Sequence, residues 1–421
     1  MKARLGPQYA RLWTASTISS IGDGVTLAAM PLLAASLTRE PETIALVTLF
    51  ATLPWLLFSL ITGALADRFD RRLIMGGTDV VRCLILGGLG AIVLAGWESI
   101  PLLCVVAFVL GTAECLFDNT SLAILPMVVE PSALESANSR LYAASLVTNE
   151  FVGPPFGALL FAWVAAAPFL LDAGSFAIAA ALVLMLHGTF RVTARPRARL
   201  RTEIGEGLRY LRRHVLLRTL AIALGIMNFL EAGMLAIFVL YALEVLHLTR
   251  TEYGLLLAAG AFGAVIGSLI APWMSKRLGP GRMLLCCALG FGATALVPAV
   301  WANAFAVGVS SAVSFGFGIA WNVVTISLRQ ELVPPELLGR VASAYRVVGL
   351  GPKPLGAALG GALAAAFGLR APFFLAFGVT IVAGLALVPW VNNRTVAAAR
   401  AAGRVPDRDD ARDEGVGDRR A

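Results

Sequence analysis

Long apolar segments separated by short polar ones run along the whole of the 421-residue chain. Each is long enough to cross about 30 Å of hydrocarbon, which takes about 20 apolar residues in a helix. Backbone polar groups inside lipid must bond within their own segment, so these runs predict helices rather than strands. We predict about twelve spans on this basis. They are residues 11–37, 43–66, 73–95, 101–125, 140–162, 169–190, 216–246, 252–274, 283–301, 305–328, 341–366 and 372–393.

The longest internal polar segment, residues 191–214, falls near the middle of the chain. Leu208 and Leu211 recur at helical spacing among its arginines, which predicts an amphipathic helix on the membrane surface. Segments 119–145 and 322–348 resemble each other, as parallel repeats around a central cavity would. We predict an all-α integral membrane protein of two six-helix repeats. Its predicted parts are an N-terminal six-helix bundle (1–190), a cytoplasmic linker (191–214), a C-terminal six-helix bundle (215–393) and a disordered cytoplasmic tail (394–421).

The composition favours membrane insertion, since hydrophobic residues make up 58% of the chain and charged residues 14%. Soluble proteins contain roughly 25% charged residues. The net charge of +8 comes from basic residues at the amino terminus, in alternate loops and in the tail, while the other loops hold only Arg39, Arg250 and Arg370. This asymmetry follows the positive-inside rule. It predicts a multi-pass protein of the cell inner (plasma) membrane with both termini in the cytoplasm, whose partner is the lipid bilayer and not nucleic acid.

The loop between the second and third predicted spans, residues 63–72, reads GALADRFDRR. It resembles the signature of the major facilitator superfamily, apart from Asp70, where that family usually has glycine. The resemblance implies a twelve-helix transporter whose loop acts as a latch between the halves, with Arg71 paired to Asp118 at the cytoplasmic end of the fourth span. A solvated loop that only sets topology is the alternative. The residues assigned to the latch are Gly63, Asp67, Arg68, Arg71, Arg72 and Asp118.

The fifth predicted span contains NEFVGPPFGA, residues 149–158, which resembles the Gly-Pro-x-x-Gly signature of proton-coupled exporters. Proline removes a backbone donor and glycine admits close contact, so the stretch predicts a kinked, tightly packed helix. The resemblance implies that Gly153, Pro154 and Gly157 take part in the conformational change. Asn149 stands where glycine is common in the family, and simple packing is the alternative.

One carboxylate, Asp23, stands inside the apolar run of the first predicted span. About 12 residues of helix, or about 18 Å, place it near the middle of the bilayer. An acid there is costly when charged, so it needs a cavity, a partner or a proton. The surrounding GDGVTLAAMPLLA resembles the macrolide- and siderophore-exporter branch of drug efflux carriers. The arginine usual in the fourth span of that family is missing from LGTAECLFD, residues 110–118.

Further charged residues fall near the middle of predicted spans. For each acid, a satisfied hydrogen bond between helices is the alternative to a functional role, and we favour that alternative for Asp172. Asp79 and Arg82 lie three residues apart on one helical face, where a local ion pair is equally expected. The candidates for coupling to substrate or protons are Asp23, Glu114, Glu150, Glu231 and Lys353.

The sequence contains no Gly-x-x-x-x-Gly-Lys-Ser/Thr loop, no His-Glu-x-x-His pair and no Gly-x-Ser-x-Gly elbow. We therefore expect no enzyme activity, no metal and no cofactor, with energy taken from a proton gradient. The predicted function is secondary active export of amphipathic small molecules, drugs or a natural product, by proton antiport and alternating access in a monomer. The alternatives are a proton symporter that imports a nutrient and, from another class, a transport-inactive membrane scaffold or sensor.

Overall fold

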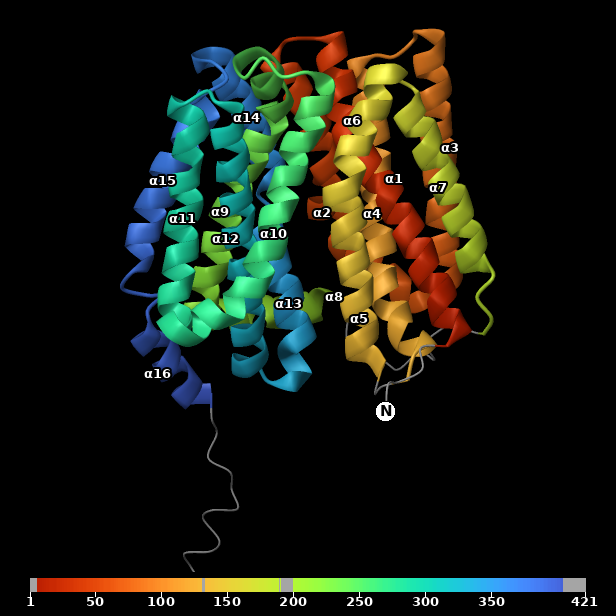
Figure 1. The fold of residues 1–421 in the computed structure, drawn as a ribbon. Helices are drawn as coiled ribbons and strands as arrows, with labels where there is room; N and C mark the ends of the chain where they lie inside the picture. Colours follow the sequence, from red (N-terminus) through yellow and green to blue (C-terminus); the bar gives the residue numbers. More distant parts are fainter. Residues whose placement is uncertain (1–5, 131–132, 189, 191–199, 404–421) are drawn as a thin grey trace, which may run out of the picture.

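The computed structural model describes residues 6–130, 133–188, 190 and 200–403, and their regular structure is entirely helical. Figure 1 shows two bundles side by side, the first coloured red to yellow-green and the second green to blue. The predicted linker is described only from residue 200, and the predicted tail only to residue 403, so the rest of both lies outside the described residues.

The N-terminal bundle is built on long apolar helices, several of which begin at proline. Proline fits the first helical position because the N–H that it lacks would have no partner there, as at Pro7 and Pro41. Asp70 caps the third helix by accepting from the Arg72 N–H at 2.9 Å. The elements are α1 (Pro7–Leu37), α2 (Pro41–Arg68), α3 (Arg71–Ala95), α4 (Ile100–Val128), α5 (Leu134–Ser145), η2 (Leu146–Val152), α6 (Gly153–Trp163) and α7 (Ala167–Leu184).

The C-terminal bundle repeats this plan after a short amphipathic helix. Thr249 and Glu252 form a capping box at the start of one of its long helices, which satisfies two backbone donors. The elements are α8 (Leu200–Arg213), α9 (Val215–Leu240), η3 (Tyr241–Val245), α10 (Arg250–Leu278), α11 (Pro280–Val300), α12 (Ala304–Leu332), α13 (Pro335–Leu350), α14 (Lys353–Phe367), α15 (Ala371–Leu387) and α16 (Asn393–Gly403).

In the described part of the chain, ten helical segments are long and apolar enough to span a membrane. A further apolar helix, α15, is shorter than these ten. The fifth predicted span is divided into α5, the π-helical segment η2 and α6, a break that the sequence pattern did not show. Together these segments confirm the predicted twelve-span, all-α architecture. Short π-helical segments often lie at functional sites, and η2 contains Glu150.

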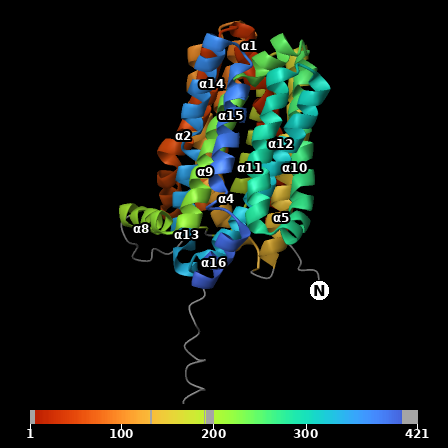
Figure 2. The same cartoon turned by 90° about the vertical axis from the view of Figure 1, so that its left-hand side faces the viewer.

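The helix α8 lies across one end of the molecule, which we call the linker end, and α16 lies at the same end (Figures 1 and 2). α8 is fixed to the C-terminal bundle. Its Tyr210 hydroxyl donates to the Leu332 carbonyl at 2.9 Å, and its Glu206 forms an ion pair with Arg340 of α13. The predicted linker helix is therefore docked on the second bundle rather than suspended between the two.

At the end opposite α8, the two bundles share one hydrophobic core. Gly361 of α14 lies so close to α2 that an added Cβ would come within 3.1 Å of the Glu42 Cα. Arg39 Nη1 lies 3.6 Å from Glu244 Oε1 across the same junction. The core at this end includes Leu32, Leu33, Ile44, Tyr241 and Tyr253.

At the linker end, the helices pack mainly within their own bundle. α5 packs against α1, α4 and η2, whereas α12 packs against α10, α11, α13 and α16. A cross-bundle hydrogen bond runs from Arg346 Nη1 of α13 to Asn119 Oδ1 of α4, at 3.3 Å. The protein is therefore tightly closed at the end opposite α8 and more loosely joined at the linker end.

Candidate functional site

Asp23 of α1 and Arg82 of α3 form an ion pair inside the N-terminal bundle, with 4.0 Å between Asp23 Oδ1 and Arg82 Nη1. The Arg82 side chain is 2% exposed and that of Asp23 is 36% exposed. Arg82 also lies over two aromatic rings, with its Cζ 5.2 Å from the centre of the Phe117 ring and 5.0 Å from that of Phe176. Arg82 is therefore in contact with residues of three neighbouring helices, while the Asp23 side chain remains partly exposed.

Two glycines on either side of Asp23 fix its position. An added Cβ at Gly22 would come within 2.8 Å of the Asp172 Cγ on α7, and one at Gly24 within 2.8 Å of the Asn149 Cα on η2. Glycine is needed at Gly22 because the Asp172 and Ser175 side chains of α7 fill the space beside it, and at Gly24 because α1 approaches the backbone of η2. The sequence Gly-Asp-Gly thus places the carboxylate at a point where α1 is fixed on two sides.

The local ion pair considered for Asp79 and Arg82 is not formed. Arg82 directs Nη1 to Asp23 on another helix, and both carboxyl oxygens of Asp79 lack a hydrogen-bond partner among the described residues. The Arg82 guanidinium group instead lies over the rings of Phe117 and Phe176, where its Nη1 meets Asp23. Sequence spacing identified a possible partner on the same helix, but not the competing partner on α1.

Glu114 and Asp118 lie one turn apart on α4, and both side chains are exposed. Their charges, with that of Asp23, act on Arg82, so the structure brings three of the predicted acids around one arginine. Basic residues of the other bundle act on the same acids, Lys353 on Glu114 and Arg346 on Asp118. This face of α4 is therefore acidic and is opposed by basic residues of α13 and α14.

Glu231, Lys353 and Glu150 form a second charged group between the bundles. Lys353 Nζ of α14 lies 3.7 Å from Glu231 Oε2 of α9, and each side chain is about a third exposed. Glu150 of η2, on the N-terminal side, is subject to the charges of both. The five predicted coupling residues thus fall into two groups, and Lys353 connects them electrostatically because its charge also acts on Glu114.

The residues assigned to the latch are only partly described, because the surroundings of Gly63 and the side chains of Asp67 and Arg68 lie outside what the structure describes. Arg71 is buried and donates from Nη1 to Met127 Sδ at 3.1 Å. Arg72 Nη1 donates to the Leu186 carbonyl at 2.8 Å.

Asp118 is not paired with Arg71 in this conformation. The charges that act on the Asp118 carboxylate are those of Arg82, Asp23 and Arg346. The pairing implied by the family resemblance therefore does not describe this state of the protein. Arg346, the residue of the other bundle whose charge acts on Asp118, could not be identified from the loop motif.

The Gly-Pro-x-x-Gly motif places α6 against one helix of each bundle. An added Cβ at Gly153 would come within 2.6 Å of the Gly24 Cα, and one at Gly157 within 2.8 Å of the Val25 Cα. On the opposite side, the Pro154 carbonyl oxygen lies 2.7 Å from where a Cβ would stand on Gly254 of α10. The motif therefore forms backbone-to-backbone contacts with α1 and α10 at once.

Asp172 has the hydrogen bonds of a structural residue. The Thr26 hydroxyl of α1 donates to Asp172 Oδ2 at 2.5 Å, and the Ser175 hydroxyl donates to Oδ1 at 3.0 Å. These bonds join α7 to α1 beside Asp23. The geometry agrees with the packing role that we favoured for this acid.

A cavity of about 650 Å³ lies between α1 and α5. Its walls are mainly apolar with a few polar groups, which is the usual lining of a small-molecule site. Asp23 lies further along α1 from Thr17, and Glu150 follows Thr148. The lining residues include Tyr9, Trp13, Thr17, Arg140, Val147 and Thr148.

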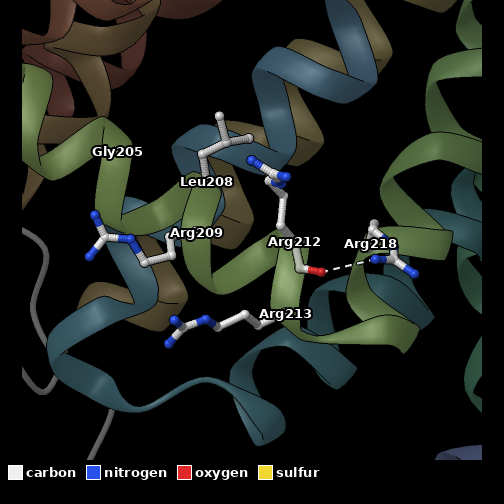
Figure 3. Close-up of a pocket in the computed structure, with 6 residues that line it drawn as sticks. All are labelled: Gly205, Leu208, Arg209, Arg212, Arg213 and Arg218. Carbon is white, nitrogen blue, oxygen red and sulfur yellow. Dashed lines mark hydrogen bonds between the residues drawn. The ribbon is translucent and has the colours of Figure 1, made fainter.

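A second cavity, of about 490 Å³, lies at the linker end between α8 and the start of α9 (Figure 3). Its arginines are Arg209, Arg212, Arg213 and Arg218, and their guanidinium groups point in different directions in Figure 3. Arg218 Nη1 donates to the Arg212 carbonyl at 3.1 Å. Because the four groups do not converge on one point, we place the functional site at Asp23 and Arg82 instead.

Comparison with known proteins agrees with the fold and with the motifs. The sequence profile described as Major Facilitator Superfamily matches residues 12–349 and 221–410. The multidrug efflux pump Tap of Mycolicibacterium fortuitum is 28% identical over 392 residues, which cover 87% of this chain and 91% of that protein. Macrolide efflux protein A of Streptococcus pyogenes is 26% identical over 401 residues, covering 91% and 96%.

Among solved structures, the nucleoside transporter NupG superposes with a TM-score of 0.73 at 12% identity, covering 91% of this chain and 99% of that one. At this identity the similarity shows the fold alone. The profile match, by contrast, extends over most of the chain and includes both bundles. The chain is therefore a membrane transporter rather than an enzyme, and it belongs to the Major Facilitator Superfamily.

Proposed function

We propose that this transporter exports amphipathic small molecules, drugs or a natural product, in exchange for protons. The observation that carries the proposal is the ion pair between Asp23 and Arg82, in which a membrane-embedded acid is partly exposed while its arginine is buried. An acid of this kind can take up a proton and release its arginine. Intramembrane acids that pair with a base and face a water-accessible space commonly serve in proton coupling.

Arg82 supplies the positive charge that the sequence lacks in the fourth span. Exporters of this family usually have an arginine there, whereas this chain has Glu114 and Asp118 on the same helix. Arg82 of α3 reaches α4 by lying against Phe117. We infer that the proton-coupling pair is formed by α1 and α3 in this protein, so that its mechanism needs no arginine on α4.

Two features support an amphipathic substrate. The cavity between α1 and α5 combines apolar walls, such as Tyr9 and Trp13, with polar groups, such as Thr17 and Arg140. Exposed acids on α4, Glu114 and Asp118, favour molecules that also carry a positive group. The names of two relatives, a multidrug efflux pump and a macrolide efflux protein, agree with export of such molecules.

We further propose that the protein acts as a monomer in the cell inner (plasma) membrane, with both termini and α8 on the cytoplasmic side. The arginines of α8, such as Arg212 and Arg213, would then follow the positive-inside rule. The bundles are closed at the end opposite α8, which corresponds to one of the two states that alternating access requires. Protons and the substrate are the expected partners within the bilayer, with no nucleic acid, and the proton gradient takes the place of any cofactor.

Inside-out membrane vesicles from cells that produce the protein provide the test, with ethidium as a cationic amphipathic probe. Respiration acidifies their interior, so proton antiport should drive ethidium inward, and nigericin, which collapses the pH gradient, should stop it. A one-for-one exchange of a proton for this cation moves no net charge, so the pH gradient drives it, and each pH unit supports about tenfold accumulation. Adding ethidium should also lower the pH gradient reported by a fluorescent amine. Vesicles without the protein are the control.

The alternatives predict different results in this assay. Ethidium or macrolide uptake that survives nigericin together with valinomycin, which collapse the whole proton gradient, would exclude proton antiport. Accumulation of nutrients by whole cells, with no uptake of any compound into inside-out vesicles, would favour import. The absence of transport in both orientations, for a protein that is correctly inserted, would favour a scaffold or sensor.

A further inference from the structure

Asp79 of α3 is a buried acid to which the proposed coupling pair assigns no role. Its exposed fraction is 0%, and neither of its carboxyl oxygens has a hydrogen-bond partner among the described residues. Asp172, the other acid buried to this extent near Asp23, accepts bonds from Thr26 and Ser175. Asp79 therefore differs from an acid that is held for packing.

Arg82 also has a guanidinium nitrogen without a hydrogen-bond partner among the described residues. It lies three residues after Asp79 on the same side of α3, within reach of that carboxyl group. Its Nη1 is directed to Asp23, while its Nη2 is buried and has no hydrogen-bond partner among the described residues. The charged groups that act on Asp79 are Arg82 and Asp23. One arginine thus stands between two aspartates and pairs with one of them.

A buried carboxylate without hydrogen bonds is strongly unfavourable in its charged form, and such groups take up a proton instead. With Arg82 paired to Asp23, Asp79 has no other described cation to balance a negative charge. In this conformation the favourable arrangement is therefore a charged Asp23, a charged Arg82 and a protonated Asp79. This arrangement leaves the buried cluster of three residues without net charge.

We propose that Asp79 is a second proton-binding carboxyl group of the transport cycle, and that Arg82 alternates between Asp23 and Asp79. In the exchange, the O–H bond of Asp79 breaks and an O–H bond forms on Asp23, while the guanidinium group moves from Asp23 to Asp79. The number of protons and the net charge of the cluster stay the same. The proton then lies on the partly exposed aspartate, from which it can leave to solvent.

This inference rests on the proposed function, because it gives Asp79 a role in proton antiport. It explains why Arg82 is clamped between Phe117 and Phe176 with one nitrogen free for Asp79. It also predicts that Asp23 receives its proton from the buried Asp79 rather than directly from solvent. A merely structural Asp79 would stay protonated throughout the cycle.

The Asp79→Asn variant separates these possibilities, since asparagine resembles a protonated aspartate but cannot release a proton. We expect it to bind ethidium with unchanged affinity and to lose ethidium accumulation in inside-out vesicles, down to the level of vesicles without the protein. Thr78→Val is the matched control, because it changes the neighbouring buried side chain, whose hydroxyl bonds only to its own helix at Met75. It should transport normally. Normal accumulation by Asp79→Asn would overturn the proposal.

Infrared spectroscopy of the purified protein tests the proton directly, without any transport. The wild type should show the C=O band of a protonated carboxyl group at neutral pH, Asp79→Asn should lack it, and Asp79→Glu should shift it. A spectrum that is the same in wild type and Asp79→Asn overturns the proposal. If the wild type shows the band but no proton-dependent export, the proposed function fails while the protonated state of Asp79 stands. The Asp79→Glu shift provides the answer even if Asp79→Asn does not fold.

Discussion

Asp23 Oδ1 lies 4.0 Å from Arg82 Nη1, and this contact joins the only acid of α1 to a buried arginine of α3. The pair is asymmetric, since the arginine is enclosed by aromatic rings and the aspartate is partly exposed. Protonation of the exposed partner would therefore leave a buried cation that must find another anion. This asymmetry gives Arg82 two arrangements, one paired with Asp23 and one paired with another anion, and a coupled transporter requires two such states.

The Asp23→Asn variant should insert normally and bind ethidium, but should not concentrate it. Asparagine keeps the size and hydrogen bonding of aspartate and cannot carry the charge that Arg82 faces. Accumulation in inside-out vesicles and the pH dependence of its rate are the measurements. If both match the wild type, Asp23 is a packing residue, and the coupling role passes to Glu150 or Glu231.

Replacing Arg82 should lower stability as well as transport. Arg82→Gln loses the stacking on Phe117 and Phe176, which for a desolvated cation is worth about 2 kcal/mol. Thermal unfolding in detergent of the Asp23→Asn and Arg82→Gln single variants and of the double variant forms a cycle. Two residues in contact should have a coupling energy of at least about 0.5 kcal/mol. If the two substitutions have strictly additive effects on the free energy of unfolding, the ion pair contributes nothing to stability.

Gly153→Leu should block transport, because an added side chain would collide with the backbone of α1 at Gly24. The collision should separate α6 from α1 and disturb the neighbouring contact of α6 with Gly254 on α10. Gly174→Leu on α7 is the control, since a Cβ there meets nothing within 4 Å. Vesicle uptake, measured at matched amounts of inserted protein, tests the difference. Unchanged uptake by Gly153→Leu would show that the motif has no role in transport.

The ion pair between Glu231 and Lys353 should matter more for transport than for stability. Both side chains are about a third exposed, and such pairs contribute about 1 kcal/mol or less. We expect Lys353→Glu alone to impair export and the swapped pair, Lys353→Glu with Glu231→Lys, to recover part of it. Failure of the swap, together with an unaffected melting temperature, would indicate that the position of the lysine itself is required.

His214 should make the first turn of α9 sensitive to acid. Its Nδ1 accepts from the Leu217 N–H at 3.4 Å, and burial lowers the pKa of the imidazole below its usual value of 6.5. The folded state therefore favours the neutral ring, so the cap is fully stabilising above the unfolded pKa and is lost as the pH falls through the folded pKa.

Amide hydrogen exchange at the start of α9, corrected for the intrinsic effect of pH, measures this loss. Protection should begin to fall near the unfolded histidine pKa of about 6.5 and be lost as the pH falls further, through the lower folded pKa. His214→Asn keeps a capping acceptor and should remove the pH dependence. The same pH dependence in both proteins would mean that another group controls this turn.

The apolar pattern of the sequence was sufficient to predict the helical spans and their arrangement as two six-helix repeats. Insertion of a helix into lipid depends on the length and hydrophobicity of that segment, so local information is enough. The motifs at residues 63–72 and 149–158 likewise led to the family, because a motif is a local pattern. A kink in the fifth span was predicted from residues 149–158, but the π-helical segment was not, since it depends on contacts that the pattern does not contain.

The partners of the charged residues depend on the tertiary structure. Spacing along α3 offered Asp79 as the partner of Arg82, but the nearest anion comes from α1, which the fold brings alongside. The small residues Gly153 and Gly157 predicted a close helix contact but did not identify the partner helix. The structure shows that this partner is α1. Pairing energies fall steeply with distance, so partner choice is set by how the helices are arranged in space, which a linear pattern of hydrophobic and polar residues does not specify.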